Sequence, residues 1–160
     1  MAEVQKETTK TNNGKQKKDY IFAVGRRKDS VARVRLYETV KDGLVWEGTT
    51  IKKGDIIVNK KPISEYFSGE TMRHQYTEPI RVINAQNKYT FTIAVTGGGK
   101  VGQLHATIHG IARSLAELDK KTFRPTLKKK GFLTRDPRSR ERRMVGTGGK
   151  ARRAKQSPKR

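Results

Sequence analysis

Positive charge is concentrated in the C-terminal quarter of this chain, and that placement limits how much of the chain can belong to a folded core. Its 160 residues include 37 Lys and Arg against 15 Asp and Glu, for a formal net charge of +22. Residues 120–160 hold 17 of the cations, with Asp136 and Glu141 as their acids, so +15 of the net charge lies there. From residue 135 onward there is no aromatic residue, and the apolar ones are Met144, Val145 and two alanines. Because such a segment cannot bury enough surface to fold alone, residues 135–160 are predicted to form a long extended basic tail that becomes ordered on a partner.

A charge of this size repels itself unless a polyanion neutralises it, which makes nucleic acid the first partner to consider. Residues 1–18 are predicted to be disordered as well, since they are polar and mixed in charge. They contain no apolar stretch of the kind that a secretory signal needs. No apolar run in the chain approaches the roughly 20 residues that span a bilayer. These features favour a cytoplasmic protein with no membrane partner.

The intervening residues 19–134 have the patterns of one globular α/β domain. Two strands are predicted at its start, over 20–24 and 30–37. In the second of them apolar residues alternate with Arg33 and Arg35, which places arginines on one face of a sheet and apolar groups on the other. Residues 40–50 are rich in turn-forming residues and are predicted to form a turn or small hairpin that carries Trp46.

The rest of this domain is predicted to alternate between short strands and helices. A strand over 56–59 is followed by a helical turn over 63–67 with Pro62 in its first turn. Residues 81–86 and 88–96 flank Asn87 as two strand-like segments, and the second has the clearest alternation in the chain. A basic helix over 122–130 is predicted to end at Gly131. The strongest helical pattern lies between them, after Gly97–Gly99, where apolar residues recur at spacings of four and three: Leu104, Ile108, Ile111, Leu115 and Leu118.

No catalytic or metal-binding constellation stands out. The chain has no cysteine, and both glycine–lysine stretches, at 97–100 and 148–150, lack the spacing and hydroxyl of a P-loop. His105 and His109 lie four apart on the predicted helix, but no Glu follows His105 and a third ligand is missing. Packing or contact with RNA is therefore expected of these histidines. We therefore predict no enzyme activity, no metal, no cofactor and no small-molecule substrate. The three glycines at 97–99 are interpreted as a structural turn, and contact of its amides with an RNA phosphate at the N-terminus of the following helix is left open as an additional role.

The basic clusters carry the functional signal, and they occur in two settings. Arg26-Arg27-Lys28 lies between two predicted strands, so a folded scaffold fixes its charges, and Lys128-Lys129-Lys130 closes a helix, where cations favour the carbonyl end of the dipole. In the tail, arginines and lysines are separated by glycines and small residues, and Asp136 and Glu141 are interpreted as spacers between positive charges. Arginine can bind phosphate through two N–H groups and can stack on unpaired bases. The chain is therefore predicted to bind RNA through a folded basic face and a flexible arm.

Four separated motifs resemble the small-subunit ribosomal protein S-nine family in its bacterial form, and their order and spacing match over about residues 19–160. The resemblance implies an α+β fold: a curved mixed sheet with helices packed on one face, similar to the second domain of ribosomal protein S-five, followed by a long extended basic C-terminal tail. The four motifs are Gly25-Arg26-Arg27-Lys28-x-Ser30-x-Ala32-Arg33-Val34, Gly97-Gly98-Gly99 with Gly102-Gln103, His109-Gly110-Ile111-Ala112-Arg113-x-Leu115, and Gly131-x-Leu133-Thr134-Arg135-Asp136-x-Arg138 with Glu141-Arg142.

The resemblance also implies a function in translation. A member of this family is a structural constituent of the small ribosomal subunit that binds ribosomal RNA in the subunit head, beside neighbouring small-subunit proteins. The end of its tail contacts the anticodon stem-loop of P-site tRNA, and on this chain the residues expected there are Ser157, Lys159 and Arg160. The residues expected to bind ribosomal RNA are Arg26, Arg27, Lys28, Arg33, Arg113, Lys128, Lys129, Lys130, Arg135, Arg138, Arg142, Arg143, Lys150, Arg152 and Arg153.

Two other classes of protein remain open. A basic architectural DNA-binding protein would also account for the charge. Such a protein is expected to have a helix that reads a DNA groove, or to form a dimer, whereas the apolar stripe of the clearest predicted helix here is expected to pack in the core. An RNA-processing enzyme is the second class, because the implied fold is shared with some catalytic proteins, although a fold alone assigns no chemistry. Magnesium-dependent cleavage of RNA by the purified chain would favour that class.

Overall fold

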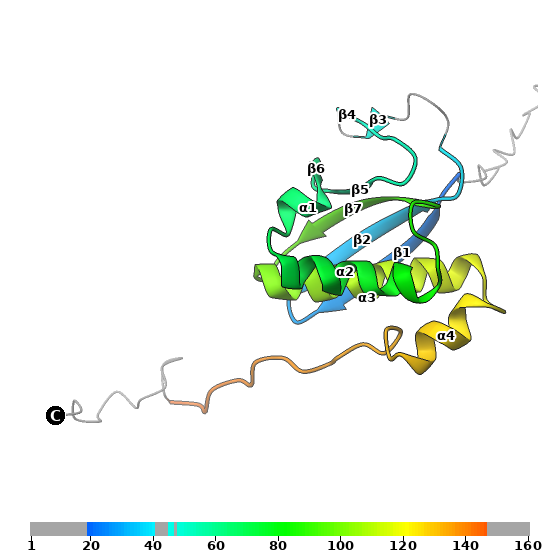
Figure 1. Cartoon of the computed structure of the whole chain (residues 1–160). Coiled ribbons are helices and arrows are strands. Elements are labelled where there is room, and N and C mark those ends of the chain that lie inside the picture. The colour runs from blue at the N-terminus through cyan, green and yellow to red at the C-terminus, as the bar shows by residue number, and fades with distance from the viewer. Residues whose placement is uncertain (1–18, 41–44, 47, 147–160) are drawn as a thin grey trace, which may run out of the picture.

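The computed structural model describes residues 19–40, 45–46 and 48–146 (Figure 1). Within them, five strands form one sheet in the order β1-β2-β7-β5-β6, and β3 and β4 form a separate hairpin. β5 runs parallel to β7, and the other neighbouring strands are antiparallel. In chain order the elements are β1 (Ile21–Arg27), β2 (Ser30–Tyr37), β3 (Val45–Trp46), β4 (Thr49–Thr50), β5 (Ile56–Val58), β6 (Lys61–Pro62), α1 (Ile63–Tyr66), α2 (Glu70–Val82), β7 (Thr90–Thr96), α3 (Lys100–Leu118) and α4 (Phe123–Lys129).

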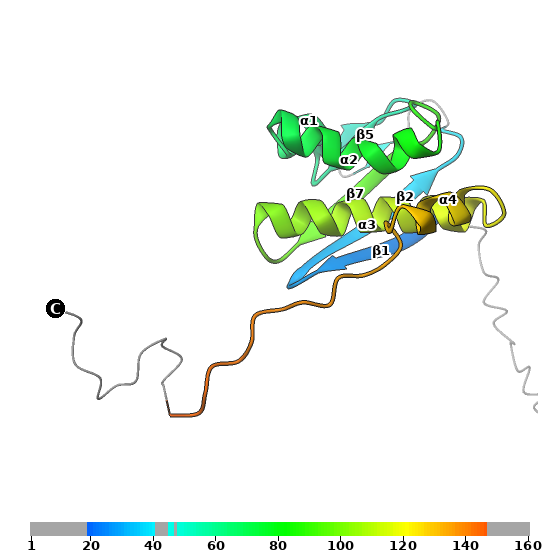
Figure 2. The ribbon, with the colours of Figure 1, turned by 60° about the horizontal axis from the view of Figure 1, so that its bottom comes forward.

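The two long helices lie side by side on one face of the sheet. α3 packs over β1 and β2, and α2 lies next to it on the side of β7 and β5 (Figures 1 and 2). The β3–β4 hairpin lies on the opposite side of the sheet from these helices (Figure 1). The predicted α+β class, with a mixed sheet and helices packed on one face, is therefore confirmed. The segments 1–18 and 147–160, which carry the predicted N-terminal disorder and the end of the predicted tail, lie outside the described residues.

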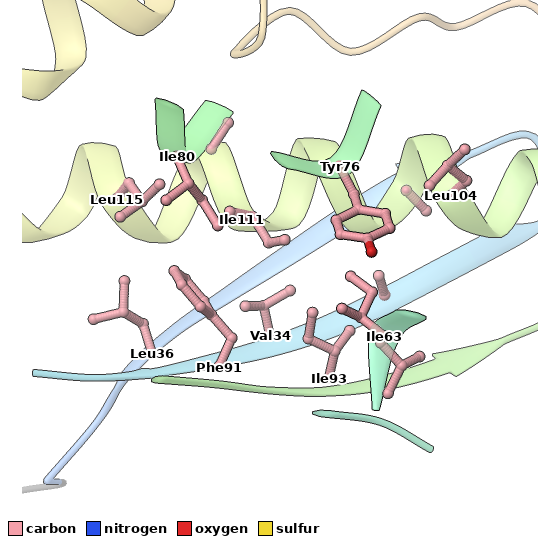
Figure 3. Packing of buried hydrophobic residues seen from close by; sticks show 14 of the residues in the cluster. Val34, Leu36, Ile63, Tyr76, Ile80, Phe91, Ile93, Leu104, Ile111 and Leu115 are labelled. Carbon is pink, nitrogen blue, oxygen red and sulfur yellow. The ribbon is translucent and has the colours of Figure 1, made fainter. Parts of the chain in front are cut away.

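The core forms between the sheet and the helices, where the apolar face of the strands packs against the apolar face of α3. In β2, Val34 and Leu36 face the helices while Arg33 faces away, as the period of two requires. Burial of each large apolar side chain contributes roughly 1.5–3 kcal/mol to folding, so this layer fixes the domain. Ile108 and Leu118 of the predicted stripe are partly buried against it. The side chains labelled in Figure 3 that are at most 6% exposed include Val34, Leu36, Phe91 and Ile93 from the sheet, Tyr76 and Ile80 from α2, and Leu104, Ile111 and Leu115 from α3.

β1 and α3 approach each other so closely that two glycines are required at the crossing. A Cβ atom on Gly25 would lie 1.9 Å from the carbonyl oxygen of Ala106 and 2.4 Å from the amide nitrogen of Gly110. A Cβ on Gly110 would lie 2.6 Å from a methyl group of Val34. Glycine inside a helix costs about 1 kcal/mol relative to alanine, and here that cost is offset by direct packing of the helix on the strand backbone. This contact accounts for one glycine in each of two motifs.

Most of the predicted strands and helices are confirmed, but residues 81–86 were wrongly predicted as strand. They hold the end of α2 and a turn, and α2 itself was not predicted. Its apolar residues do follow helical spacing, at Met72, Tyr76, Ile80 and Ile83, but Pro79 stands among them, and proline is rare inside helices because it lacks an N–H donor. Pro62 is the N-cap of α1 rather than part of its first turn. Among the described residues, no helix is both long and apolar enough to cross a membrane.

Candidate nucleic-acid interface

The basic turn between β1 and β2 is held in place by the glycine turn that precedes α3. Gly97 and Gly98 have φ angles of 74° and 63°, and a Cβ on either would lie within 2.4 Å of Asp29 or Ser30. The buried hydroxyl of Ser30 donates a hydrogen bond to the carbonyl of Gly97, at 3.2 Å. The interpretation of Gly97–Gly99 as a structural turn is confirmed. It fixes the start of α3 beside the β1–β2 turn, in which Lys28 lies. Arg26 and Arg27, predicted to lie between two strands, are instead the last two residues of β1, because the strand extends up to the turn.

Arg27 joins the end of β1 to the beginning of the tail. Its side chain, 17% exposed, lies with one guanidinium nitrogen 2.8 Å from a carboxylate oxygen of Asp136. The same nitrogen donates to the backbone carbonyl of Arg138, at 3.2 Å. This guanidinium points to the helix side of the sheet, because Ala23, Gly25 and Arg27 alternate with outward-facing residues of β1. The contact ties residues 136–138 to the folded domain and so fixes where the tail leaves it.

Asp136 has more than the spacing role that its sequence context suggested. Arg138 donates to its carboxylate from Nε, at 2.9 Å and 3.0 Å, and from Nη2, at 2.5 Å. Arg138 and, less strongly, Arg27 hold the pKa of the Asp136 carboxyl well below its usual range. The carboxylate of Asp136 therefore stays charged throughout the physiological pH range. Arg27, Asp136 and Arg138 form a compact cluster of charges where the tail leaves the domain.

His109 links β1 and α3 to the last residues of the folded domain, just before the tail begins. Its Nδ1 accepts a hydrogen bond from the backbone N–H of Arg26, at 3.4 Å, and the ring also hydrogen bonds the backbone of Leu133. Burial lowers the pKa of the imidazole, and the neighbouring charges of Arg113 and Arg135 lower it further, whereas the bond to Leu133 raises it. The net shift is downward. A neutral ring is needed for Nδ1 to accept, so the geometry and the charge state agree.

The free energy of unfolding is expected to decrease as the pH falls from 7 to 5, partly because of His109. Its folded-state pKa lies below the ordinary value of 6.5, so the unfolded chain binds a proton first. This stabilisation is complete above pH 6.5 and is lost as the pH falls through the folded pKa. Chemical unfolding across this range, at fixed ionic strength, should show a weaker pH dependence for His109→Gln than for the unmodified chain. The exposed-site control His74→Gln should keep the full dependence, and an unchanged dependence in His109→Gln would contradict this role.

Arg113 covers the outer edge of the sheet. β1 is an edge strand, and the Nη1 atom of Arg113 in α3 donates to its Val24 carbonyl at 2.5 Å. With the His109 contact to Arg26, side chains of α3 thus satisfy two backbone groups that an edge strand would otherwise leave open. Arg113 is nevertheless exposed, and its remaining donors stay available to a phosphate.

The structure brings part of the predicted RNA-binding set together around a cavity of about 400 Å³ at the foot of the tail. Its lining includes Arg27, His109, Thr134, Asp136 and Arg138. Arg26 also borders it, with its backbone N–H bonded to His109, but its side chain projects from the other face of the sheet. Lys128, Lys129 and Lys130 close α4 immediately before this region, and all three are exposed. Arg33 is not part of this group, because it lies on the sheet face that points away from the helices.

The remaining predicted residues belong to the tail. Arg135, Arg142 and Arg143 are exposed, and no regular secondary structure is present from residue 135 to the end of the described tail at residue 146, which runs away from the domain (Figures 1 and 2). Within the described ranges, no three His, Cys, Asp or Glu side chains are grouped so that they could hold a metal ion. The other predicted residues lie outside the described part of the chain: Lys150, Arg152, Arg153, Ser157, Lys159 and Arg160.

Sequence reasoning missed the attachment roles of His109 and Asp136, and it gave Arg27 only a binding role. Each of these contacts joins residues far apart in the chain, such as Arg27 and Asp136, so no local pattern predicts it. The one available signal was the presence of all three residues in motifs that also contain the basic clusters.

The sequence model of a family described as ribosomal protein S9/S16 matches residues 25–160. The matched range begins at the glycine of β1 that packs against α3, and it includes the glycine turn, α3 itself, the Arg27–Asp136 contact and the whole basic tail. More than four fifths of the sequence is therefore covered, including every residue predicted to bind RNA.

Proposed function

The chain belongs to the ribosomal protein S9/S16 family, as its four motifs predicted, and from this membership we propose how its parts act in the ribosome. It is a ribosomal protein with ribosomal RNA and other ribosomal proteins as its family's partners. In our proposal it binds RNA of the head of the small subunit in the cytoplasm, and its tail reaches P-site tRNA. The folded domain, residues 19–134, recognises the shape and backbone of structured RNA, and residues 135–160 become ordered along phosphates.

The observation that carries this proposal is the attachment of the basic tail to the basic end of the folded domain. Arg27 holds the beginning of the tail through Asp136, and His109 holds the last residues of the folded domain before it through Leu133. Along the chain, the exposed cations that close α4 come just before this attachment, and those of the tail follow it. Positive charge on both sides of the attachment suits a polyanion that extends past the domain.

The end of the tail is assigned to tRNA and the rest of the basic set to ribosomal RNA. Lys159 and Arg160 supply the last two cations, and Ser157 supplies a hydroxyl that can donate to phosphate. Arginines and lysines between the attachment point and residue 153 lie closer to the domain along the chain and are proposed to contact ribosomal RNA. This assignment rests on the resemblance to the family and on the order of the residues.

Removal of residues 158–160 should leave subunit assembly intact and weaken binding of P-site tRNA. Each of the two cations can pair with a tRNA phosphate, and a solvent-accessible ion pair contributes about 0.2–1 kcal/mol, so a decrease of about tenfold in tRNA affinity is expected. Purified small subunits that carry the truncated or the full chain should be compared in a tRNA binding assay. The control is Lys52→Ala with Lys53→Ala, which removes the same charge from an exposed loop far from the tail in sequence. Equal tRNA affinity for truncated and full-length chains would contradict the assignment.

A further inference from the structure

On the sheet face that points away from the helices, the charged side chains of β1, β2 and β7 are all positive. Arg26 of β1 and Arg33 of β2 are exposed there, and Arg35 of β2 is partly exposed. No Asp or Glu occurs anywhere in β1, β2 or β7. A face that serves only solubility normally mixes charges of both signs. This face therefore favours an anionic partner.

Apolar side chains alternate with these arginines across the two strands. The antiparallel register places Phe22 opposite Arg35, Val24 opposite Arg33, and Arg26 opposite Val31. Directly opposite residues of an antiparallel pair project from the same face, with Cβ atoms roughly 4.5–5.5 Å apart. Each cross-strand pair on this face thus combines one arginine with one apolar side chain.

Phe22 is the feature of this face that charge alone does not explain. Its side chain is 49% exposed, and every other Phe, Tyr or Trp among the described residues is buried or half-buried. Beside it, the guanidinium of Arg35 lies 5.3 Å from the centroid of the Tyr20 ring. Covering the exposed ring of Phe22 would gain the free energy that burial of an aromatic side chain provides. A partner with a flat group that stacks on this ring is therefore favoured.

We propose that this face binds an unpaired segment of RNA, with a base stacked on Phe22 and flanking phosphates held by Arg33 and Arg35. Unpaired bases expose the flat faces that stack on aromatic rings, whereas a duplex keeps its base faces inside the stack. A protein partner would have to cover three arginines with compensating acids. The part of this face nearest β5 is already covered, since Thr92 and Ile57 are 1% and 5% exposed. The site is therefore limited to β1 and β2, and to Ala94 and Thr96 of β7.

This inference rests on the proposed function, and its test separates the two. Binding of the full-length chain to a twelve-nucleotide oligouridine and to a twelve-base-pair RNA duplex should be measured at the same salt concentration. Phe22→Leu keeps an apolar side chain but removes the ring, and it should weaken oligouridine binding by roughly 5- to 150-fold without changing duplex binding. Phe22→Tyr should retain oligouridine affinity. Val101→Ala, at another exposed apolar position, serves as the control, and unchanged unfolding midpoints show that each variant is folded.

Three results would decide between the possibilities. Equal oligouridine affinity for Phe22→Leu and the unmodified chain, with both probes bound, would overturn the stacking site and leave the proposed function standing. Failure of the unmodified chain to bind either probe would count against RNA binding as a whole. In assembled small subunits, a photoreactive benzoylphenylalanine at position 22 should cross-link to RNA, and a cross-link to a protein would overturn the inference.

Discussion

Gly25→Ala is expected to destabilise the domain by about 3 kcal/mol or more, at the upper end of the range for overpacked cores. The added methyl group would overlap the backbone of α3, where the Ala106 carbonyl lies 1.9 Å from its position. Neither a strand nor a helix backbone can move aside as a flexible side chain does, so β1 and α3 must separate. Since small domains are stable by roughly 5–15 kcal/mol, a large part of the total stability would disappear.

Gly99→Ala is the matched control for this substitution. A Cβ at Gly99 would meet no atom within 4 Å, and its φ of −106° is one that alanine adopts readily. Because Gly99 is the N-cap of α3, where alanine is less favourable than glycine, Gly99→Ala should lower the free energy of unfolding by about 1 kcal/mol at most, well below the effect of Gly25→Ala. Denaturant unfolding followed by circular dichroism measures both variants. Equal midpoints for Gly25→Ala and Gly99→Ala would show that the close approach of β1 and α3 does not support the fold.

RNA affinity should fall by about 10³- to 10⁵-fold between 50 and 200 mM salt if the chain neutralises six to ten phosphates, on the scale known for duplex DNA. Each neutralised phosphate releases counterions, so the logarithm of the affinity decreases linearly with the logarithm of the salt concentration. Titration of the full chain against a structured fragment of small-subunit RNA at several salt concentrations gives the slope.

A chain that ends at residue 146 separates the contribution of the tail from that of the domain. It keeps the Arg27–Asp136 contact but lacks six cations, namely Lys150, Arg152, Arg153, Lys155, Lys159 and Arg160. The magnitude of the slope should decrease by about one for each phosphate that the shortened chain no longer neutralises. An identical slope for the full and shortened chains would mean that the tail does not follow phosphates.

The strands and helices that could be predicted from the sequence are those in which burial of one face gives the apolar residues a regular spacing. β2 and β7 alternate, and α3 repeats its apolar residues at three and four, because one face of each element packs into a single core. α2 was missed because Pro79 interrupts a pattern that is otherwise helical. Packing of Tyr76 and Ile80 in the core stabilises this helix in spite of the proline.

The candidate site could be predicted in its residue types but not in its contacts. Clusters of Arg and Lys are visible in any linear sequence, and the family motifs identified most of them. What Arg27 does with its charge depends on Asp136, which is 109 residues away. Two basic residues that look equivalent in sequence, Arg26 and Arg27, point to opposite sides of the sheet. Only the fold shows that one is exposed while the other fastens the tail.

The chain is proposed to be a component of the small ribosomal subunit, held there by the folded domain and the tail together. The decisive experiment is sedimentation of a native cell extract at low and high salt, with the chain followed by its peptides. We expect co-migration with the small subunit that largely survives the high-salt wash, because contacts of the domain and of the tail must be broken together for the chain to dissociate. Migration with chromosomal DNA, or as a free protein at low salt, would contradict the claim.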